Sequence, residues 1–447
     1  MIRTKRGLDL PIAGSPEQVI DHGTSVRSVA LVGHDYPGLK PTMEVVVGDR
    51  VKAGQLLFTD KKMPGVKYTS PGCGTVAAIN RGARRVFQSI VIDLDGDEAE
   101  TFPQEALEKL TRESAASTLI ESGQWTSLRT RPFSKVPPPS QVPNSIFVTA
   151  IDSRPHAPNP ELVIAMQPEP FLAGLDVLTL LTDGPLFLCA ENGATLPEFD
   201  NPKVRREDFS GPHPSGLVGT HIHFLDPVSL DKVVWTIDYQ DVIAIGHLFR
   251  SGNLFFDRII ALAGPAVSKP RLIRTRIGAS AHDVVKGELN SPQENDNRIV
   301  SGSVLDGRTC SPGAEYLGRY HNQISVIQEG TNRELLGFVK PGQDKFSLTR
   351  LFVSSFLPKR KFAFTTSTGG SERAMVPLGT FEEIMPLDIL PTQLLRALLV
   401  SDFDVSISLG CLELDEDDIA LCTFACPGKY EYGPYLRQML TTIEAEA

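Results

Sequence analysis

The chain has 447 residues, of which 41% are apolar and 22% charged, with a formal net charge of −10 at neutral pH. This length exceeds what one hydrophobic core serves, so we expect two to four domains, and the ordinary composition argues against extensive disorder. The acidic balance argues against a general nucleic-acid binder, the thinly spread cysteines suit a reducing compartment, and the lack of a long apolar run predicts a soluble chain that reaches a membrane only through a partner.

The first domain is expected over residues 1–102. Short runs rich in Val and Ile alternate there with Gly, Asp, Asn and Pro, the residues that form turns. The phrases VGDRVKAGQLLF and SPGCGTVAAI resemble the biotinyl/lipoyl carrier module, a flattened barrel of two interlocked sheets. A carrier places its modified lysine between two methionines, whereas the matching hairpin here reads Asp60-Lys61-Lys62-Met63-Pro64-Gly65. We therefore expect a structural or docking barrel, with a modified Lys62 as the alternative.

Residues 103–254 are expected to form a Rossmann-like α/β domain. Helical spacing over residues 106–122 stops at Gly123, and NSIFVTAID and GPLFLCA are apolar runs typical of buried parallel strands. Residues 161–181 mix strand-like and helical pieces. No G-x-G-x-x-G follows a strand, so the pattern gives no basis for a dinucleotide site.

A basic and aromatic stretch lies inside this region at residues 121–139, ESGQWTSLRTRPFSKVPPP. Such a loop can stack on a flat ring, grip an anion or clamp a neighbouring protein, and a solvated basic loop is the plain alternative. Its side chains of interest are Trp125, Arg129, Arg131, Phe133 and Lys135.

Three histidines follow in GPHPSGLVGTHIHFLDPV. If the segment is extended, His221 and His223 lie on one face, as some metal sites require, with Asp226 as the nearest carboxylate. The alternative is a loop shaped by Gly and Pro in which His213 and the other two imidazoles are hydrogen-bonded.

A β-grasp domain of the soluble-ligand-binding type is expected at residues 255–330, followed by an irregular connecting region at 331–380 with no discernible mechanism. Residues 381–447 are expected to be helical. PTQLLRALLVSDFDVSISLG has helical spacing up to Gly410, and the acidic run Glu413 to Asp418 suits the positive end of a further helix. This region holds three cysteines, Cys411, Cys422 and Cys426, too few for an iron–sulfur cluster of four thiolates, so buried thiols are the preferred interpretation.

This domain order resembles the flavin-bearing subunit of respiratory complex I and, more closely, the C subunit of the Rnf electron-transport complex. Those relatives carry a Gly-Gly-Ala-Gly-Phe-Pro loop where the backbone approaches the flavin phosphate. The matching positions here are Arg129-Thr130-Arg131-Pro132-Phe133. Because Pro132 has no N–H and the two arginines are bulky, we expect that this loop no longer binds flavin.

Longer phrases resemble one family more specifically, the A subunits of sodium-translocating NADH:quinone oxidoreductases. The resemblance runs from residue 2 to about residue 440. The phrases that carry it are IRTKRGLDLPIAG, RPFSKVP, GPHPSGLVGTH, YLGRYH and ELDEDDIALCTFACPGKYEYG.

The resemblance implies a peripheral subunit on the cytoplasmic face of a bacterial inner membrane. The six-subunit complex, A to F, oxidises NADH, reduces ubiquinone to ubiquinol and exports sodium, with FMN, FAD and iron–sulfur centres in other subunits. The implied protein partners are subunits B to F, with direct contacts to the membrane B subunit and to the C subunit. Ubiquinone is the implied small-molecule partner. The isolated chain is expected to have no catalytic residue and no metal of its own.

A quinone headgroup requires a flat apolar slot and hydrogen-bond donors at its carbonyls. In residues 121–139, Trp125 and Phe133 could form the slot, and Arg129, Arg131 or Lys135 could donate. In LVGHDYPGL, residues 31–39, His34 and Tyr36 could donate or relay protons. Both loops could instead be contacts with other subunits, since arginines and aromatics also dominate interfaces, and a scaffold without quinone contact is the alternative function.

Overall fold

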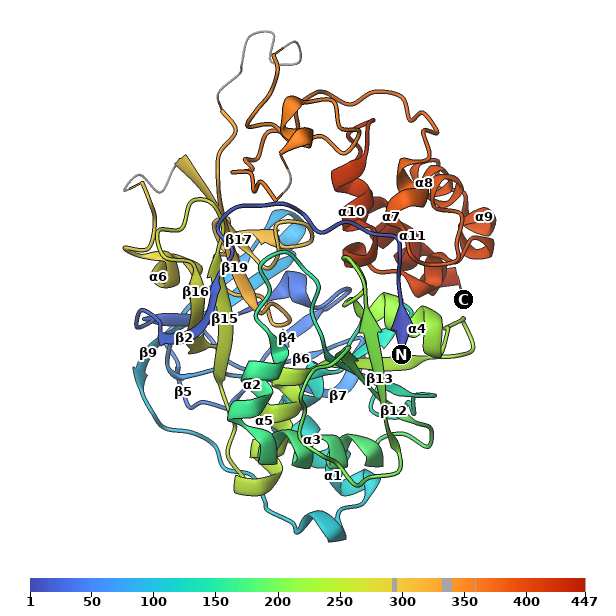
Figure 1. Cartoon of the computed structure of the whole chain (residues 1–447). Coiled ribbons are helices and arrows are strands. Elements are labelled where there is room, and N and C mark those ends of the chain that lie inside the picture. The colour runs from blue at the N-terminus through green and yellow to red at the C-terminus, as the bar shows by residue number, and fades with distance from the viewer. Residues whose placement is uncertain (292–295, 332–339, 358, 447) are drawn as a thin grey trace.

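The computed structural model describes residues 1–291, 296–331, 340–357 and 359–446. Within these residues the strands form four sheets, and a group of short helices gathers at the C-terminal end of the chain (Figure 1). The expected multidomain α/β fold is confirmed, with a barrel sandwich, a parallel α/β domain, a second mixed sheet and a helical C-terminal region.

The barrel sandwich consists of two sheets with strand orders β3-β9-β8-β5 and β4-β6-β7. Side chains such as Phe58, Val66, Tyr68, Val76 and Ile90 are buried between the two sheets and form the core of the barrel. The hairpin that would carry a modified lysine joins β6 to β7 with an exposed Lys61–Lys62 turn. The strands are β3 (Ser28–Val32), β4 (Pro41–Met43), β5 (Arg50–Val51), β6 (Leu56–Asp60), β7 (Met63–Thr69), β8 (Cys73–Arg81) and β9 (Phe87–Gly96).

Two strands within the first 22 residues pair with sheets outside the barrel. Strand β1 (Ile2–Arg3) lies parallel to β13 (Val204–Ser210) of the α/β domain, and β2 (Glu17–His22) lies parallel to β16 (Arg271–Arg276) of the following sheet. The start of the chain therefore ties together two domains that come later in the sequence.

The α/β domain has the sheet order β1-β13-β12-β11-β14-β10, in which β10 alone runs antiparallel to its neighbour β14. Helices cover both faces, as expected: Ile146 and Val148 of β11 belong to the main core, while Phe147 belongs to the core under α4. The helices are α1 (Arg112–Glu121), α2 (Pro160–Met166), α3 (Pro168–Leu180), α4 (Val218–Leu225) and α5 (Tyr239–Ser251), and the strands are β10 (Arg129–Arg131), β11 (Ile146–Ala150), β12 (Leu186–Glu191) and β14 (Val234–Asp238).

Residues 161–181 contain no strand, so the strand-like part of that prediction is wrong. Helix α2 ends at Met166, and α3 begins with Pro168 at its first turn, where a proline costs no hydrogen bond. Among the described residues no single helix is long and apolar enough to cross a membrane; α2 and α3 pass that test only as a pair, bent by 100°.

The next sheet has the order β18-β17-β19-β15-β16-β2 and is covered by the short helix α6 (Ala281–Val285), in agreement with the expected β-grasp. Gly278, with φ +68°, makes the turn before α6. Its remaining strands are β15 (Asp257–Ala263), β17 (Asn297–Ser301), β18 (Arg308–Thr309) and β19 (Gln323–Gln328).

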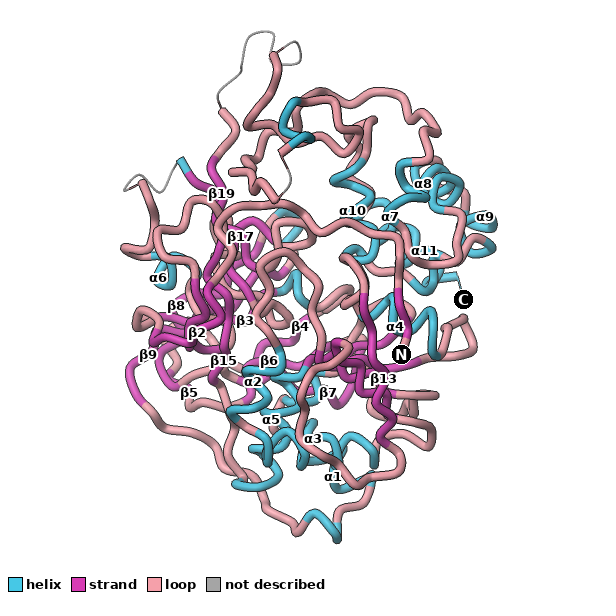
Figure 2. The backbone as a smooth tube through the Cα atoms, viewed as in Figure 1, coloured by secondary structure: helices cyan, strands magenta, loops and turns pink. Residues whose placement is uncertain are grey.

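The C-terminal helices have a hydrophobic core of their own. The expected helix up to Gly410 is two helices, because Ser401 adopts a left-handed φ of 55° and the Asp402 side chain caps the next helix by accepting from the Val405 N–H. Most of residues 340–378 are loop, as the long pink stretch at the top of Figure 2 shows. The helices are α7 (Thr380–Ile384), α8 (Pro391–Leu399), α9 (Phe403–Ser408), α10 (Glu416–Ala425) and α11 (Gly433–Glu446).

Candidate functional site

Residues 121–139 begin where α1 meets the barrel. Gly123 ends the helix with φ +79°, and a Cβ at this position would lie 2.2 Å from the Thr69 hydroxyl oxygen of β7. The Thr69 hydroxyl donates to the Ser122 carbonyl at 3.0 Å. Only glycine fits this contact, so the stretch is fixed at its start to the barrel.

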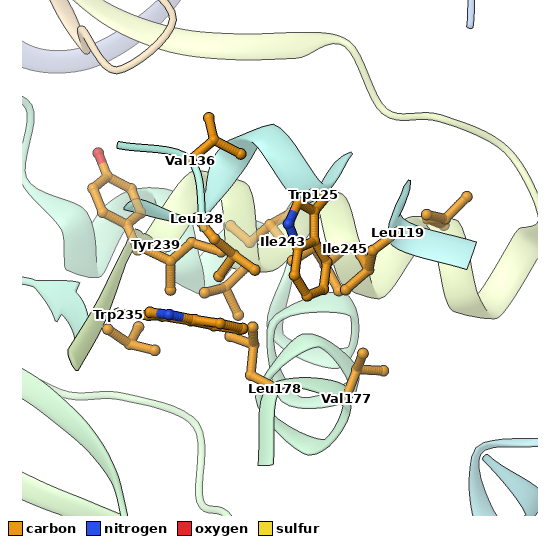
Figure 3. Packing of buried hydrophobic residues seen from close by; sticks show 14 of the residues in the cluster. Leu119, Trp125, Leu128, Val136, Val177, Leu178, Trp235, Tyr239, Ile243 and Ile245 are labelled. Atoms are coloured by element: carbon orange, nitrogen blue, oxygen red, sulfur yellow. The ribbon is translucent and has the colours of Figure 1, made fainter. Parts of the chain in front are cut away.

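Trp125 is buried at the centre of the stretch, with 1% of its surface exposed. Its indole N–H donates to the Pro137 carbonyl at 2.9 Å, which ties the start of the stretch to its end. The ring also packs edge-on against Trp235 with a centroid separation of 5.4 Å (Figure 3). The indole therefore serves the main core of the protein, where a ligand does not reach it.

The middle of the stretch is a tight turn held by Thr130. The Thr130 hydroxyl donates to the Pro132 carbonyl at 2.9 Å and accepts from the Lys135 N–H at 3.2 Å. Phe133 and Ser134 have φ values of 77° and 53°, a left-handed conformation that is uncommon for residues with a side chain. The turn thus keeps a backbone shape that glycine adopts easily, although its side chains are large.

Arg131 enters the N-terminal end of α10, more than 280 residues away in sequence. Its guanidinium donates to Asp418 at 2.9 Å and to the Glu413 carbonyl at 2.9 Å, and it lies 3.4 Å from Asp417 and 3.5 Å from Asp415. Only 2% of its side chain is exposed. Burial alone would lower the pKa of Arg131, but the three carboxylates raise it above its ordinary value, so the group stays charged.

Two further arginines complete this cluster. Arg129 donates to Asp415 at 2.8 Å, and Arg437 of α11 donates to Glu416 at 2.6 Å and to the Phe133 carbonyl at 2.8 Å. Burial would raise the pKa of Asp415, but the arginines, Arg131 first, hold it well below its ordinary value. We call Arg129, Arg131 and Arg437 together with Asp415, Asp417 and Asp418 the arginine clasp, because they join the α/β domain to the helical domain.

Lys135 and Phe133, the remaining side chains of interest in the stretch, also contact the helical domain. Lys135 forms an ion pair with Glu444 of α11, and Phe133 packs, partly buried, against the core of the helical domain. The acidic run Glu413 to Asp418, expected to suit the positive end of a helix, does so, because its last three residues form the first turn of α10, and it also pairs with the arginines of the clasp.

The second loop of interest, residues 31–39, meets this stretch at a cluster of tyrosines. The Tyr36 ring lies 4.9 Å from Tyr68 of β7 and 6.2 Å from Tyr320, both edge-on. The Tyr320 hydroxyl donates to the Thr126 carbonyl at 2.8 Å, and the Arg129 guanidinium lies 4.8 Å above the Tyr320 ring. We call Tyr36, Tyr68 and Tyr320 the tyrosine junction.

Lys135 forms a second contact between residues 121–139 and residues 31–39. A Cβ built on Gly38 would lie 3.2 Å from the Lys135 ammonium nitrogen, so the Lys135 side chain passes directly over the loop at residues 31–39. In the same loop, His34 is exposed, whereas only 4% of the Tyr36 surface is exposed. Burial raises the pKa of Tyr36 well above its ordinary value, so the phenol remains a neutral hydrogen-bond donor at neutral pH.

A small pocket of about 30 Å³ borders the junction. Tyr36, Tyr68, Gln124 and Arg319 line it, and the Gln124 side-chain oxygen is buried without a hydrogen-bond partner there. A space of this size holds on the order of one or two water molecules, so a quinone ring does not enter it in this conformation. Tyr68, Arg319 and Tyr320 were not predicted as site residues, although the last two lie in the phrase YLGRYH.

The segment with His221 and His223 is neither extended nor a loop, so both predictions of its backbone are wrong, but all three imidazoles are hydrogen-bonded, as the loop interpretation expected. His221 and His223 are on helix α4, where residues two apart point in different directions. His221 is buried with its Nε2 3.1 Å from the Ser215 carbonyl, and His223 donates from Nδ1 to Glu413 at 2.8 Å while its Nε2 accepts from the Asp388 N–H. His213 contacts the Ser153 hydroxyl at 3.1 Å.

Asp226, the carboxylate considered with these histidines, accepts from Asn144 and Ser145 at 2.8 and 2.6 Å instead. In the described part of the chain, no group of three or more His, Cys, Asp or Glu side chains is arranged to hold a metal ion.

Burial of His221 leads to a pH-dependent prediction. Burial lowers the pKa of His221 to about 3, so the folded chain keeps it neutral where the unfolded chain protonates it, below about pH 6.5. The folded state therefore loses stability through this residue as the pH falls. We expect His221→Gln to gain stability relative to the wild type by about 1.4 kcal/mol per pH unit between about pH 6 and pH 4. Urea unfolding of both proteins across this range measures that difference, and a constant difference would contradict the assignment.

The three C-terminal cysteines are buried free thiols, as the preferred interpretation stated. Cys411 and Cys422 lie in the core of the helical domain, where burial raises the pKa of each thiol to about 12, and the Cys426 sulfur lies 3.1 Å from the Tyr432 hydroxyl.

Comparison with known families covers most of the chain. Family descriptions match at residues 2–95 (NqrA N-terminal barrel-sandwich hybrid domain), 110–254 (NqrA second alpha/beta domain) and 259–311 (NQRA C-terminal domain). The chain is 57% identical to the A subunit of the Na(+)-translocating NADH-quinone reductase of Saccharophagus degradans and 58% identical to that of Pseudomonas aeruginosa, in each case over 100% of both chains. A solved NAD+-reducing [NiFe]-hydrogenase is similar at 14% identity over 76% of this chain and 65% of the other, with a TM-score of 0.37, too low to carry an argument.

Proposed function

The chain belongs to the family formed by the A subunits of Na(+)-translocating NADH-quinone reductases, and on that premise we propose that it works at the quinone-reducing end of the complex. We place it as a peripheral member on the cytoplasmic face of the inner membrane, in contact with the membrane B subunit, as well as with the C subunit. The reaction it serves transfers electrons from NADH to a quinone, with NADH oxidation and the redox centres in other subunits.

One observation carries the quinone part of the proposal. The two loops chosen from the sequence for quinone chemistry, about 90 residues apart, meet at the tyrosine junction. Lys135, in residues 121–139, passes over Gly38, in residues 31–39. Beside the buried tyrosines, the partly exposed Arg129, Phe133 and Lys135 bring an aromatic ring and cations together, and this combination supports the chemistry that a quinone headgroup requires.

The structure supports different roles for the candidate residues. His34 is exposed and Lys135 and Phe133 are half-buried, so these three offer atoms to a quinone or to a neighbouring protein of the complex. Trp125 and Arg131 are buried and engaged inside the chain, so we assign them to positioning the loop.

The pocket beside the junction limits how a quinone can approach. With room for only about two water molecules, it excludes full entry of the ring. We therefore propose that the headgroup contacts the outer edge of the two loops, in a cleft completed by the B subunit. Cations there would stabilise the negative charge that develops on the quinone oxygens during reduction.

A photoreactive ubiquinone analogue, applied to the assembled complex, tests the proposal. We expect labelled peptides from residues 31–39 and 133–139 of this chain, and loss of that label when excess ubiquinone competes. Labelling confined to other subunits would contradict the proposal and favour a scaffold without quinone contact.

A further inference from the structure

A loop at residues 350–357, with Lys359, Arg360 and Lys361, has features that neither the clasp nor the junction uses. We call it the outer loop. It belongs to the connecting region at the top of Figure 1, beside the helical domain. Its base is fixed by aromatic contacts, because Phe346 and Phe364 lie 6.2 and 5.9 Å from Phe424 of α10.

Further contacts hold the base of the outer loop in place. Phe362 is buried, and its carbonyl accepts from the Ala13 N–H at 2.8 Å. Inside the loop, residues 353–356 form a short 3-10 helix, and the Ser354 hydroxyl donates to the Lys345 carbonyl. The tip is therefore presented by an ordered base.

The tip is the most apolar exposed feature of the described chain. Phe356 and Leu351 are 83% and 77% exposed, more than any other large apolar side chain in the described residues, and Val353 and Leu357 are 44% and 46% exposed. Exposed apolar side chains gathered in one short segment mark a surface that is covered in the working protein.

Cations flank this tip on both sides. Arg350 precedes it, and Lys359 and Lys361 follow it, all three with exposed side chains. Residues 340–361 contain six Lys or Arg against a single acidic residue, Asp344, in a chain whose net charge is −10. The acidic body would be repelled by an anionic surface, so this basic segment is where such a surface can approach.

We propose that the outer loop seats on the anionic lipid surface of the membrane, with Leu351 and Phe356 inserted among the headgroups and the flanking cations against lipid phosphates. Apolar side chains beside lysine and arginine are what the boundary between headgroups and acyl chains accommodates, and each cation near an anionic leaflet adds to the attraction. A protein partner would need an apolar groove ringed by acids to match the same segment. This inference rests on the proposed placement of the chain beside the membrane.

Flotation of the full chain with lipid vesicles tests it. We expect binding to vesicles of phosphatidylethanolamine and phosphatidylglycerol, weakening as salt rises, and no binding to phosphatidylcholine alone. The double variant Leu351→Ser/Phe356→Ser and the double variant Lys359→Gln/Lys361→Gln should each bind the anionic vesicles on the order of tenfold more weakly.

A matched control uses the barrel. Val46 and Val47 are also exposed, at 64% and 60%, but residues 44–52 carry two acids, Glu44 and Asp49, against two cations, Arg50 and Lys52. Val46→Ser/Val47→Ser should therefore bind like the wild type. A wild-type chain that ignores anionic vesicles would overturn the inference, as would binding that none of the outer-loop changes weakens. If those changes instead block assembly of the complex, the loop is a protein-docking surface, and the inference is again overturned. The quinone proposal is judged separately by labelling, which does not depend on vesicle binding.

Discussion

Replacing Arg131 with methionine should lower the free energy of unfolding by about 3–5 kcal/mol and release the C-terminal helices from the rest of the chain. Asp418, whose side chain is 3% exposed, would keep the backbone N–H of Asp415 as a donor but lose the guanidinium that compensates its burial. The same change removes the donor to the carbonyl of Glu413, the last residue of the 3-10 helix Cys411–Glu413 before α10. Urea unfolding and limited proteolysis of the full chain measure the two effects.

A control and a conservative variant sharpen this test. Arg112 pairs with Asp183 at 2.6 Å, but 33% and 83% of their side chains are exposed, so Arg112→Met should cost less than about 1 kcal/mol. Arg131→Lys should fall between, because an ammonium restores the charge without the fork that reaches both Asp418 and the Glu413 carbonyl. Equal unfolding midpoints for Arg131→Met and the wild type would refute the clasp.

Replacing Asp241 with alanine should have an effect of similar size at the tyrosine junction. Asp241 of α5 accepts from Arg319 at 2.9 Å and also contacts Arg258 of β15, and all three side chains are at most 5% exposed. Without the carboxylate, two buried guanidiniums lose their shared partner, which we expect to cost about 3–5 kcal/mol. The change should also loosen the contact between the α/β domain and the following sheet, because Arg319 precedes Tyr320.

The matched control for this prediction is Asp257. It lies 3.8 Å from Arg274, and 45% and 40% of the two side chains are exposed, so Asp257→Ala should cost less than about 1 kcal/mol. Denaturant unfolding, followed by tyrosine and tryptophan fluorescence, compares the two variants. If both lose the same small amount of stability, Asp241 does not hold the junction together.

Local patterns predicted the elements whose cause is local. The turns of the barrel follow from Gly and Asp between apolar runs, and the start of α10 follows from its acidic run. Helix α1 likewise stops where Gly123 takes a left-handed conformation. The family phrases also indicated correctly which relatives the chain has.

Contacts between distant segments could not be predicted in this way. Nothing near Arg131 in the sequence indicates that its partners are Asp415, Asp417 and Asp418. The sequence does not distinguish an arginine that is buried in an ion pair from one that is exposed to solvent. Two histidines with the spacing of His221 and His223 lie on one face only in an extended segment. Both residues belong to helix α4, where they point in different directions. The contact between Tyr320 and Tyr36 depends on the fold, so the sequence did not indicate Tyr320 as a site residue.

The function of residues 121–139 is accordingly clearer than the sequence alone allowed. Its arginines hold the helical domain, its tryptophan joins the core, and its outer side chains meet the loop at residues 31–39. These contacts support the proposal that residues 121–139 position a quinone-facing edge.

A structure of the assembled complex with a quinone-site inhibitor bound tests these assignments most directly. We expect the inhibitor to lie within contact distance of His34, Lys135 or Phe133, with Arg131 still enclosed by Asp415, Asp417 and Asp418. An inhibitor held wholly within other subunits, with both loops covered by protein, would contradict the proposed role of this chain.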